Sequence, residues 1–178
     1  MLTLRGAPAL SAFSRQKLLQ NIQSSLPVVK AIHAWYYHFV DLNDDLSAQE
    51  RFLLERLLTY GPRQDDEPEC AGASFFLVTP RPGTISPWSS KATDIAINCG
   101  LDKLKRLERG IAYQVECESE PDMDLLKTHL YDRMTQSVLD SLDEAEILFS
   151  HSAPRSVTSV DILGGGELTL TEANQSMG

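Results

Sequence analysis

Residues 38–58 read HFVDLNDDLSAQERFLLERLL, and residues 113–134 read YQVECESEPDMDLLKTHLYDRM. Each segment begins like a strand, continues through an acidic turn, and ends in apolar residues spaced for one face of a helix. The two segments start 75 residues apart, at His38 and Tyr113. The match is in pattern and not in identity, and it predicts a chain built from two similar halves.

Further elements are expected on both sides of these segments. In the first half we expect a short strand over 2–4, a helix over 11–25, and a strand over 27–42 that is continuous, bent or folded into a tight hairpin. A helix over 47–62 follows, since Ser47 and Glu50 form a capping box and Gly61 with Pro62 ends it. The helix over 11–25 is predicted from the spacing of four apolar residues: Phe13, Leu18, Leu19 and Ile22.

In the second half we expect a buried strand over 74–78, a helix over 89–100 that ends at Gly100, and a strand over 104–117. The alternation along this last strand puts Leu107 and Arg109 on one face and Glu108 on the other. The longest helix is predicted over 121–149, from apolar residues that repeat every four positions: Leu126, Leu130, Met134, Val138 and Leu142.

These elements predict an α+β fold in which two ferredoxin-like α/β halves form a pseudo-dimeric sandwich. The halves span about 2–60 and 74–149 of a domain over 1–150, and a polar loop over 63–72 separates them. Residues 151–178 are expected to be the start of a flexible linker, with a short strand over 157–163 and a helix that stops after about two turns. We therefore expect that a longer protein continues beyond Gly178.

Composition excludes several classes of function. Lys and Arg total 16 and Asp and Glu total 25, so the net charge is −9 and a nucleic-acid partner is not expected. The three cysteines, Cys70, Cys99 and Cys117, give no disulfide framework and no metal-binding pair. With no signal sequence and no membrane-length apolar run, we expect a soluble cytoplasmic protein without a membrane partner.

Catalytic motifs are not found in the sequence. His33 and His38 differ by an odd number, so on one strand they face opposite sides and cannot share a metal. Cys99 ends a predicted helix, whereas a catalytic thiol is favoured at a helix start. Gly164 to Gly166 lack the preceding strand–helix context of a dinucleotide-binding motif and are interpreted as a flexible joint, so we assign no catalytic, cofactor-binding or metal-binding residue.

The segment TPRPGTISPWSSKATDIAINCG, residues 79–100, has two interpretations. In one, three prolines rigidify a turn and Ser89 or Ser90 caps the following helix. In the other, the segment is a docking surface or an anion site at a helix start, with Trp88 as an interface anchor. The candidate residues for the second interpretation are Arg81, Thr84, Ser86, Trp88, Ser89, Ser90, Lys91 and Arg109.

The segments VTPRPGTISPWSSKATDIAINCGL and RLERGIAY resemble the N-terminal domain of the large, single-chain phosphoribosylformylglycinamidine synthases. LRGAPALSAF, YYHFVDL, LLTYGP and VTSVDILG also fit, so the resemblance covers nearly the whole chain, with weak matching in RQDDEPECAGAS and ECESEPDM. The resemblance implies a domain similar to a dimer of a small subunit that is separate in multi-component versions, which agrees with the repeated pattern.

The family's enzyme uses ATP, Mg²⁺ and glutamine to convert formylglycinamide ribonucleotide to formylglycinamidine ribonucleotide in purine biosynthesis. The resemblance implies a structural role here, which is to bridge the synthetase and glutaminase regions so that ammonia passes between them. It also implies that the ligands of ATP and magnesium and the glutaminase triad lie beyond Gly178, so this chain alone is expected to be inactive. A free-standing module that binds a small molecule, or an assembly adaptor, remains the alternative.

Overall fold

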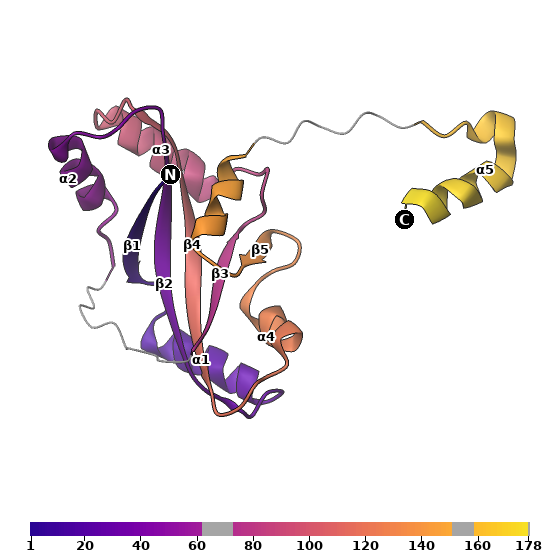
Figure 1. Ribbon diagram of the computed structural model, residues 1–178, viewed down its shortest axis with the longest axis horizontal. Helices are drawn as coiled ribbons and strands as arrows, with labels where there is room; N and C mark the ends of the chain where they lie inside the picture. The colour runs from indigo at the N-terminus through magenta and orange to yellow at the C-terminus, as the bar shows by residue number, and fades with distance from the viewer. Residues whose placement is uncertain (62–72, 151–158, 178) are drawn as a thin grey trace.

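The computed structural model describes residues 1–61, 73–150 and 159–177 (Figure 1). The predicted polar loop over 63–72 and the first part of the predicted linker, 151–158, fall outside these residues. The elements in chain order are β1 (Leu2–Pro8), α1 (Ala12–Gln23), β2 (Val29–Leu42), α2 (Ala48–Leu57), β3 (Ser74–Pro80), α3 (Pro87–Asn98), β4 (Leu104–Cys117), α4 (Met123–Leu130), β5 (Gln136–Leu139), the 3-10 helix η1 (Asp143–Phe149) and α5 (Ile162–Met177).

The strands form a five-stranded antiparallel sheet in the order β1-β2-β4-β3-β5. Its centre is the pair of 14-residue strands β2 and β4, in which His38 is paired with Arg109 and Tyr36 with Ile111. The predicted α+β class is confirmed, and the sheet with its helices is consistent with a ferredoxin-like fold. The order β1-β2-β4-β3 is what two halves paired through β2 and β4 would give, but the two-fold relation itself stays a prediction.

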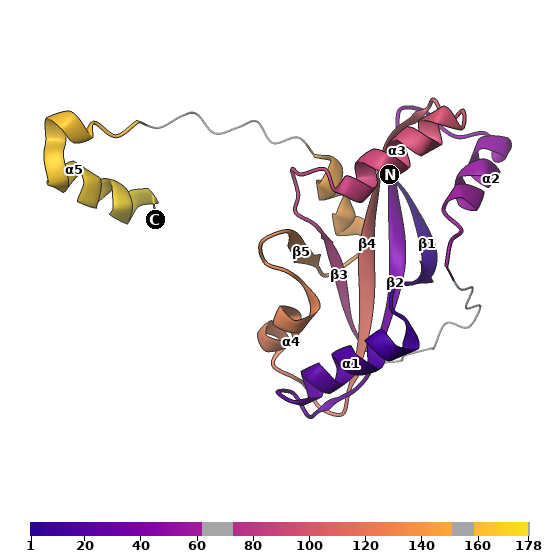
Figure 2. The same ribbon diagram turned by 180° about the vertical axis from the view of Figure 1, so that it is seen from behind.

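Four helices cover one face of the sheet, which we call the helix face. Figures 1 and 2 show α1 and α4 at one end of the sheet and α2 and α3 at the other. Each pair buries its own apolar cluster because alternate residues of β2 and β4 point to this face. Ile22 of α1 and Leu126 of α4 are buried at one end, and Leu54 of α2 and Ala96 of α3 are buried at the other.

The opposite face of the sheet is covered in part by η1. Phe39, Leu77 and Ala112 point to this side and pack against Ala145 and Leu148 of η1, and all five residues are at most 2% exposed. The centre of β4 is therefore buried on both faces. This burial explains why a polar residue of β4 can lie in the interior, as Glu108 does.

Several predicted local features are confirmed. Ser47 and Glu50 form the capping box of α2, and Gly100 follows the last turn of α3 with a φ of 95°, a conformation that favours glycine. β2 is one continuous strand, so the alternative of a hairpin is wrong. Helix α3 begins at Pro87 with Ser86 as its cap, so the caps predicted at Ser89 or Ser90 are also wrong.

The long helix predicted over 121–149 is wrong. The structure divides this segment into α4, β5 and η1. Leu126 and Leu130 are buried as predicted, but Met134 is 78% exposed, because the chain leaves the helix at Tyr131 and becomes extended. Phe13 in α1 is also exposed, so it does not belong to the core stripe predicted for that helix.

The C-terminal segment forms the helix α5, so the strand predicted over 157–163 is wrong for its described residues. The glycine run lies inside this helix, which is kinked at Gly166, where φ is 61°. Four of its apolar side chains are exposed: Ile162, Leu163, Leu168 and Leu170. Among the residues that the structure describes, no helix is long and apolar enough to cross a bilayer.

Candidate functional site

The loop between β3 and α3 has a defined shape because its own polar groups hold it. The hydroxyl of Thr84 donates to the Arg81 carbonyl over 2.6 Å, and Gly83 has a φ of 81°. The backbone N–H of Arg81 donates to the Thr135 carbonyl over 3.2 Å, which ties the loop to the start of β5. The loop ends at Ser86, whose hydroxyl accepts from the Ser89 N–H over 3.0 Å and caps α3.

The buried side chain of Glu108 lies at the N-terminal end of α3. Its carboxylate is fully buried and accepts from the Ser86 hydroxyl over 2.6 Å and from the Ser86 N–H over 3.4 Å. A carboxylate at a helix N-terminus is favoured by the free N–H groups and the helix dipole. The anion that we predicted at this helix start is therefore supplied by the chain itself in this structure.

Arg106 completes this buried ionic network. Its Nη2 lies 2.7 Å from a carboxylate oxygen of Glu108 and donates to the Thr84 carbonyl over 2.8 Å. Its Nη1 donates to the Leu148 carbonyl of η1 over 3.0 Å, and its Nε donates to the Ser89 hydroxyl over 3.3 Å. The network joins β4, the loop, α3 and η1, so it fixes the shape of the loop.

The eight predicted candidate residues fall into three groups. Ser86 and Ser89 belong to the ionic network, and Ser89 is fully buried, with its hydroxyl donating to the Leu107 carbonyl. Trp88 and Arg109 lie together in a second cluster. The remaining four candidates are exposed: Arg81, Thr84, Ser90 and Lys91. A docking role for these residues stays a prediction, and the structure brings only some of them together.

The second cluster, which we call the Arg109 cluster, lies on the helix face between the two pairs of helices. It consists of Tyr36, His38, Tyr60, Trp88 and Arg109. The guanidinium carbon of Arg109 lies 4.2 Å from the ring centre of Tyr36 and 4.9 Å from that of Trp88, and Nη1 donates to the Tyr60 hydroxyl over 3.0 Å. Stacking on aromatic rings stabilises a cation without an acidic partner.

His38 is the fully buried member of this cluster. Its Nε2 is 2.7 Å from the Tyr60 hydroxyl, and its ring centre is 5.6 Å from that of Trp88. Burial and the nearby positive charge of Arg109 lower the pKa of His38 from 6.5 to about 4. His38 is therefore neutral at physiological pH, and its partner Tyr60 has a raised pKa because it too is partly buried.

Gly6 of β1 makes room for the buried imidazole. A Cβ atom at this position would lie 2.5 Å from Cε1 of His38 and 3.2 Å from the Cβ of Tyr36. A larger residue at position 6 would therefore displace the floor of the Arg109 cluster. The cluster is built by four separate segments of the chain: β2, the end of the α2 segment, α3 and β4.

An apolar groove of about 200 Å³ adjoins the Arg109 cluster between α2 and α3. Tyr60 and Trp88 belong to both the groove and the cluster, and the charged side chain of Lys91 stands at the rim. Apolar residues from both helices and from β4 line the rest of the groove: Leu57, Leu58, Ala92, Ile95, Ala96 and Leu107. Trp88 is thus partly buried.

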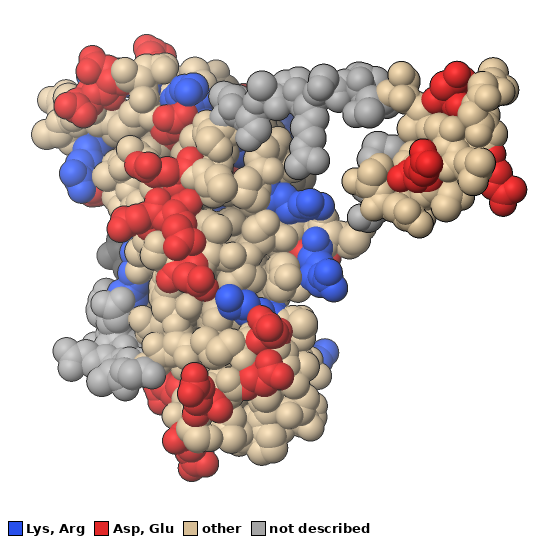
Figure 3. Space-filling model, turned by 45° about the vertical axis from the view of Figure 1, so that its right-hand side comes forward, with Lys and Arg blue, Asp and Glu red and all other residues tan. Residues whose placement is uncertain are grey.

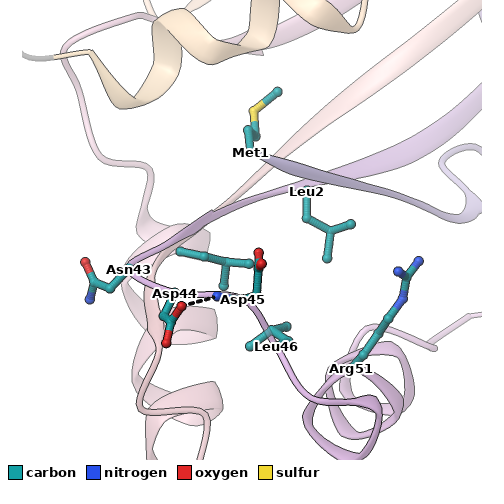
Figure 4. A pocket seen from close by; sticks show the side chains of 8 residues that line it. Met1, Leu2, Asn43, Asp44, Asp45, Leu46 and Arg51 are labelled. Carbon is teal, nitrogen blue, oxygen red and sulfur yellow. Dashed lines mark hydrogen bonds between the residues drawn. The ribbon is translucent and has the colours of Figure 1, made fainter.

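A larger hollow of about 670 Å³ lies at the turn between β2 and α2 (Figure 4). Asn43, Asp44 and Asp45 border it on the turn, Met1 and Leu2 lie at the start of β1, and Arg51 comes from α2. Asp44 accepts from the Asp45 N–H over 2.9 Å, as drawn in Figure 4, so this carboxylate stabilises the turn. The hollow is acidic and exposed.

Charge is unevenly distributed over the surface. Figure 3 shows Asp and Glu side chains spread over much of one side of the molecule, with Lys and Arg in smaller groups. One basic group borders a hollow of about 380 Å³ beside β5, where Arg81, Lys127 and Arg133 approach it. Lys127 pairs with Asp140 at 3.4 Å, so this region holds part of its charge in an internal ion pair.

Within 1–61, 73–150 and 159–177, no group of three His, Cys, Asp or Glu residues is placed to hold a metal ion. Cys99 is exposed at the C-terminal end of α3, and burial raises the pKa of the Cys117 thiol. Cys70 lies outside the described residues.

Several residues of the ionic network and of the Arg109 cluster were not predicted from the sequence. The sequence predicted only that Glu108 lies on the face of β4 opposite to Leu107 and Arg109, and it did not indicate Tyr36, His38 and Tyr60 as site residues. Their one common signal is that they are polar or aromatic residues on strands or helix ends whose partners are distant in the sequence. A single sequence gives no measure of such contacts.

Comparison with known families identifies most of the chain. The model of a family described as "Formylglycinamide ribonucleotide amidotransferase N-terminal" matches residues 35–149. The match begins in β2 and ends with η1, so it includes the buried ionic network. It also includes the four residues of the Arg109 cluster that lie on β2, α3 and β4: Tyr36, His38, Trp88 and Arg109. Tyr60 lies within the matched range too.

Proposed function

Because the chain belongs to the formylglycinamide ribonucleotide amidotransferase N-terminal family, we propose that it is the docking domain of an ATP- and glutamine-dependent ligase. That ligase converts formylglycinamide ribonucleotide to formylglycinamidine ribonucleotide in purine biosynthesis. In this role the domain bridges the synthetase and glutaminase regions and keeps their reaction centres in register. ATP and Mg²⁺ bind to other regions of the ligase and not to this chain.

The family match over 35–149 is the observation that carries this proposal. It is supported by the surface around α3, where a partly buried aromatic residue, Trp88, stands beside the exposed cation Lys91. Interfaces commonly place such an aromatic residue at their centre with charged residues at the rim. The loop before α3 is held by the Glu108 network, so little conformational entropy is lost on docking.

The proposal is tested by adding the purified chain to a formylglycinamide ribonucleotide amidotransferase from which the N-terminal domain has been removed. We expect the chain to bind and to restore the coupling between glutamine hydrolysis and formylglycinamidine ribonucleotide formation. Lys91→Ala should weaken the restored coupling and leave the unfolding of the chain nearly unchanged, because Lys91 is exposed. Arg133→Ala, which removes an exposed cation beside β5, is the matched control.

Trp88→Ala should weaken coupling too, but it should also destabilise the chain. Trp88 packs against the cluster of Leu54 and Ala96, so we expect a loss of about 1–3 kcal/mol, less than for a fully buried aromatic residue. If the chain fails to bind, or binds without any effect on coupling, the docking function is wrong.

The alternative is a free-standing module that binds a small molecule or assembles with another protein. The observation that favours it is the hollow in Figure 4, whose volume of about 670 Å³ is within the range of ligand pockets, roughly 300–1,000 Å³. A stable chain that binds a metabolite through Asp44 and Asp45, and does not bind the truncated ligase, would support this second function.

A further inference from the structure

We propose that the Arg109 cluster and the groove between α2 and α3 together form a socket for one acidic and one aliphatic side chain of a partner protein. The proposal rests on the docking function and names the chemistry of the docked segment. The carboxylate of the segment would reach Arg109 or Lys91, and its aliphatic side chain would enter the groove. The partner is a segment of the synthetase or glutaminase region.

The first argument is the state of the two cations. Among the described residues, neither the guanidinium of Arg109 nor the ammonium of Lys91 pairs with a carboxylate. The chain has a net charge of −9, so carboxylates are abundant and yet none is used here. Arg109 is also partly buried, and the rings and the Tyr60 hydroxyl beside it stabilise its charge without neutralising it. Charge complementarity therefore points to an acidic partner.

The second argument is the size and lining of the groove. Its volume of about 200 Å³ equals roughly seven water molecules at ~30 Å³ each, and it is below the ~300 Å³ at which ligand pockets begin. Such a space holds an aliphatic side chain and excludes a nucleotide. The walls are apolar except for Tyr60, Trp88 and Lys91, so an aliphatic side chain would lose no hydrogen bond on entering.

The third argument is the rigidity of the aromatic walls. Tyr60 is held by hydrogen bonds to both His38 and Arg109, and Trp88 is fixed by its ring contact with His38 and by the first turn of α3. Tyr60 and Trp88, which both contact Arg109, are thus in place before any partner arrives. A preformed aromatic wall beside a cation is an arrangement that lowers the entropy cost of binding.

Isovalerate and isovaleramide test the socket without any assumption about the partner. Both share a branched aliphatic tail, but only isovalerate carries a carboxylate. In an NMR titration of the 178-residue chain, isovalerate should shift the indole N–H signal of Trp88 and the methyl signals of Ala92 and Ile95. Isovaleramide should bind about tenfold more weakly, since charge-assisted hydrogen bonds are roughly twice as strong as neutral ones.

Two variants show which cations contribute to isovalerate binding. Arg109→Gln and Lys91→Gln should each weaken isovalerate binding about threefold to tenfold. Arg109 also packs on two rings, so Lys91→Gln, which changes an exposed side chain, keeps the test valid if Arg109→Gln unfolds. Arg133→Gln should change nothing. Equal binding of isovaleramide, no shift at Trp88, or no effect of either variant would overturn the socket.

A second measurement separates this proposal from the docking function. The same variants are added to the truncated amidotransferase, and the dissociation constant of the complex is measured. If the wild-type chain binds and Lys91→Gln and Arg109→Gln bind equally well, docking stands and the socket is wrong. If the wild-type chain does not bind but isovalerate shifts Trp88 as described, the socket stands and the docking function is wrong.

Discussion

His38 is a histidine that the fold keeps neutral. It is fully buried, and the groups that face it are the Tyr60 hydroxyl, the Trp88 ring and the positively charged Arg109. Protonation of His38 would bury a second positive charge beside Arg109. Stability therefore depends on pH in part through this residue, and the sign of its contribution follows from its lowered pKa.

We predict that the chain loses stability as the pH falls from 6.5 to about 4. In this window the unfolded chain protonates His38 and the folded chain does not, so protons favour unfolding by up to about 1.4 kcal/mol per pH unit. Urea unfolding of the wild type and of His38→Gln should be compared at pH 7, 5.5 and 4. The variant should show a flatter dependence, and parallel curves for the two proteins would contradict the assignment.

Glu108 is a second buried group with a definite energetic role. Its removal leaves the guanidinium of Arg106, which is only 17% exposed, without its carboxylate. We expect Glu108→Ala to reduce the free energy of unfolding by about 3–5 kcal/mol, the usual cost of breaking a buried ion pair.

The matched control is Glu116→Ala on the same strand. The Glu116 carboxylate is 41% exposed and lies 3.7 Å from His33, so its loss should cost less than about 1 kcal/mol. The two variants are compared by urea unfolding at pH 7. Similar losses for both would mean that the Glu108 network does not stabilise the loop and α3.

At the scale of elements, Leu130 and Met134 distinguish α4 from the long helix that the sequence favours. Leu130 is 6% exposed at the end of α4, and Met134 is 78% exposed in the turn after it. Leu130→Ala should therefore cost about 2–5 kcal/mol by leaving a cavity, whereas Met134→Ala should cost less than about 0.5 kcal/mol. Chemical unfolding of both variants checks this. A continuous helix would bury both residues and give two large losses.

The periodicity of residues 121–149 failed for a local reason and a tertiary reason. Locally, Asp132 accepts from the Met134 N–H over 2.8 Å and from the Thr135 hydroxyl over 3.1 Å, and this turn stops the helix. In the tertiary structure, β3 offers a free edge, and Gln136–Leu139 pairs with it as β5. A spacing of four residues cannot reveal an edge that is distant in the sequence.

Elements whose signals are local were predicted well. The capping box of α2 needs only Ser47 and Glu50, and the end of α3 needs only a glycine that can take a positive φ at Gly100. The alternation in β4 correctly placed Leu107 and Arg109 on one face, where Leu107 is buried. The same alternation placed Glu108 on the opposite face, but it contains no information about η1, which covers that side.

At the scale of the whole molecule, the candidate site depends on the pairing of β2 with β4. That pairing brings His38 opposite Arg109 in the middle of the sheet, and the ends of α2 and α3 then add Tyr60 and Trp88. The sequence indicated Trp88 and Arg109 separately, through composition and through alternation. It could not show that they touch, because contact between residues 88 and 109 requires the α3–β4 turn to return the chain over the sheet.

The last prediction concerns activity of the chain alone. We expect the purified chain to hydrolyse neither glutamine nor ATP, because glutamine hydrolysis needs an activated thiol or hydroxyl beside a base. Cys99 lies at the C-terminal end of α3, opposite to the position that favours catalytic thiols, and the raised pKa of Cys117 keeps that thiol protonated at neutral pH. The run from Gly164 to Gly166 lies inside α5 and is followed by Glu167 and not by the lysine of a phosphate-binding loop. Ammonia release from glutamine and phosphate release from ATP should both be measured against a mock purification, with Cys99→Ser and Cys117→Ser as controls. Turnover above the mock that disappears in either variant would show that this domain carries chemistry of its own.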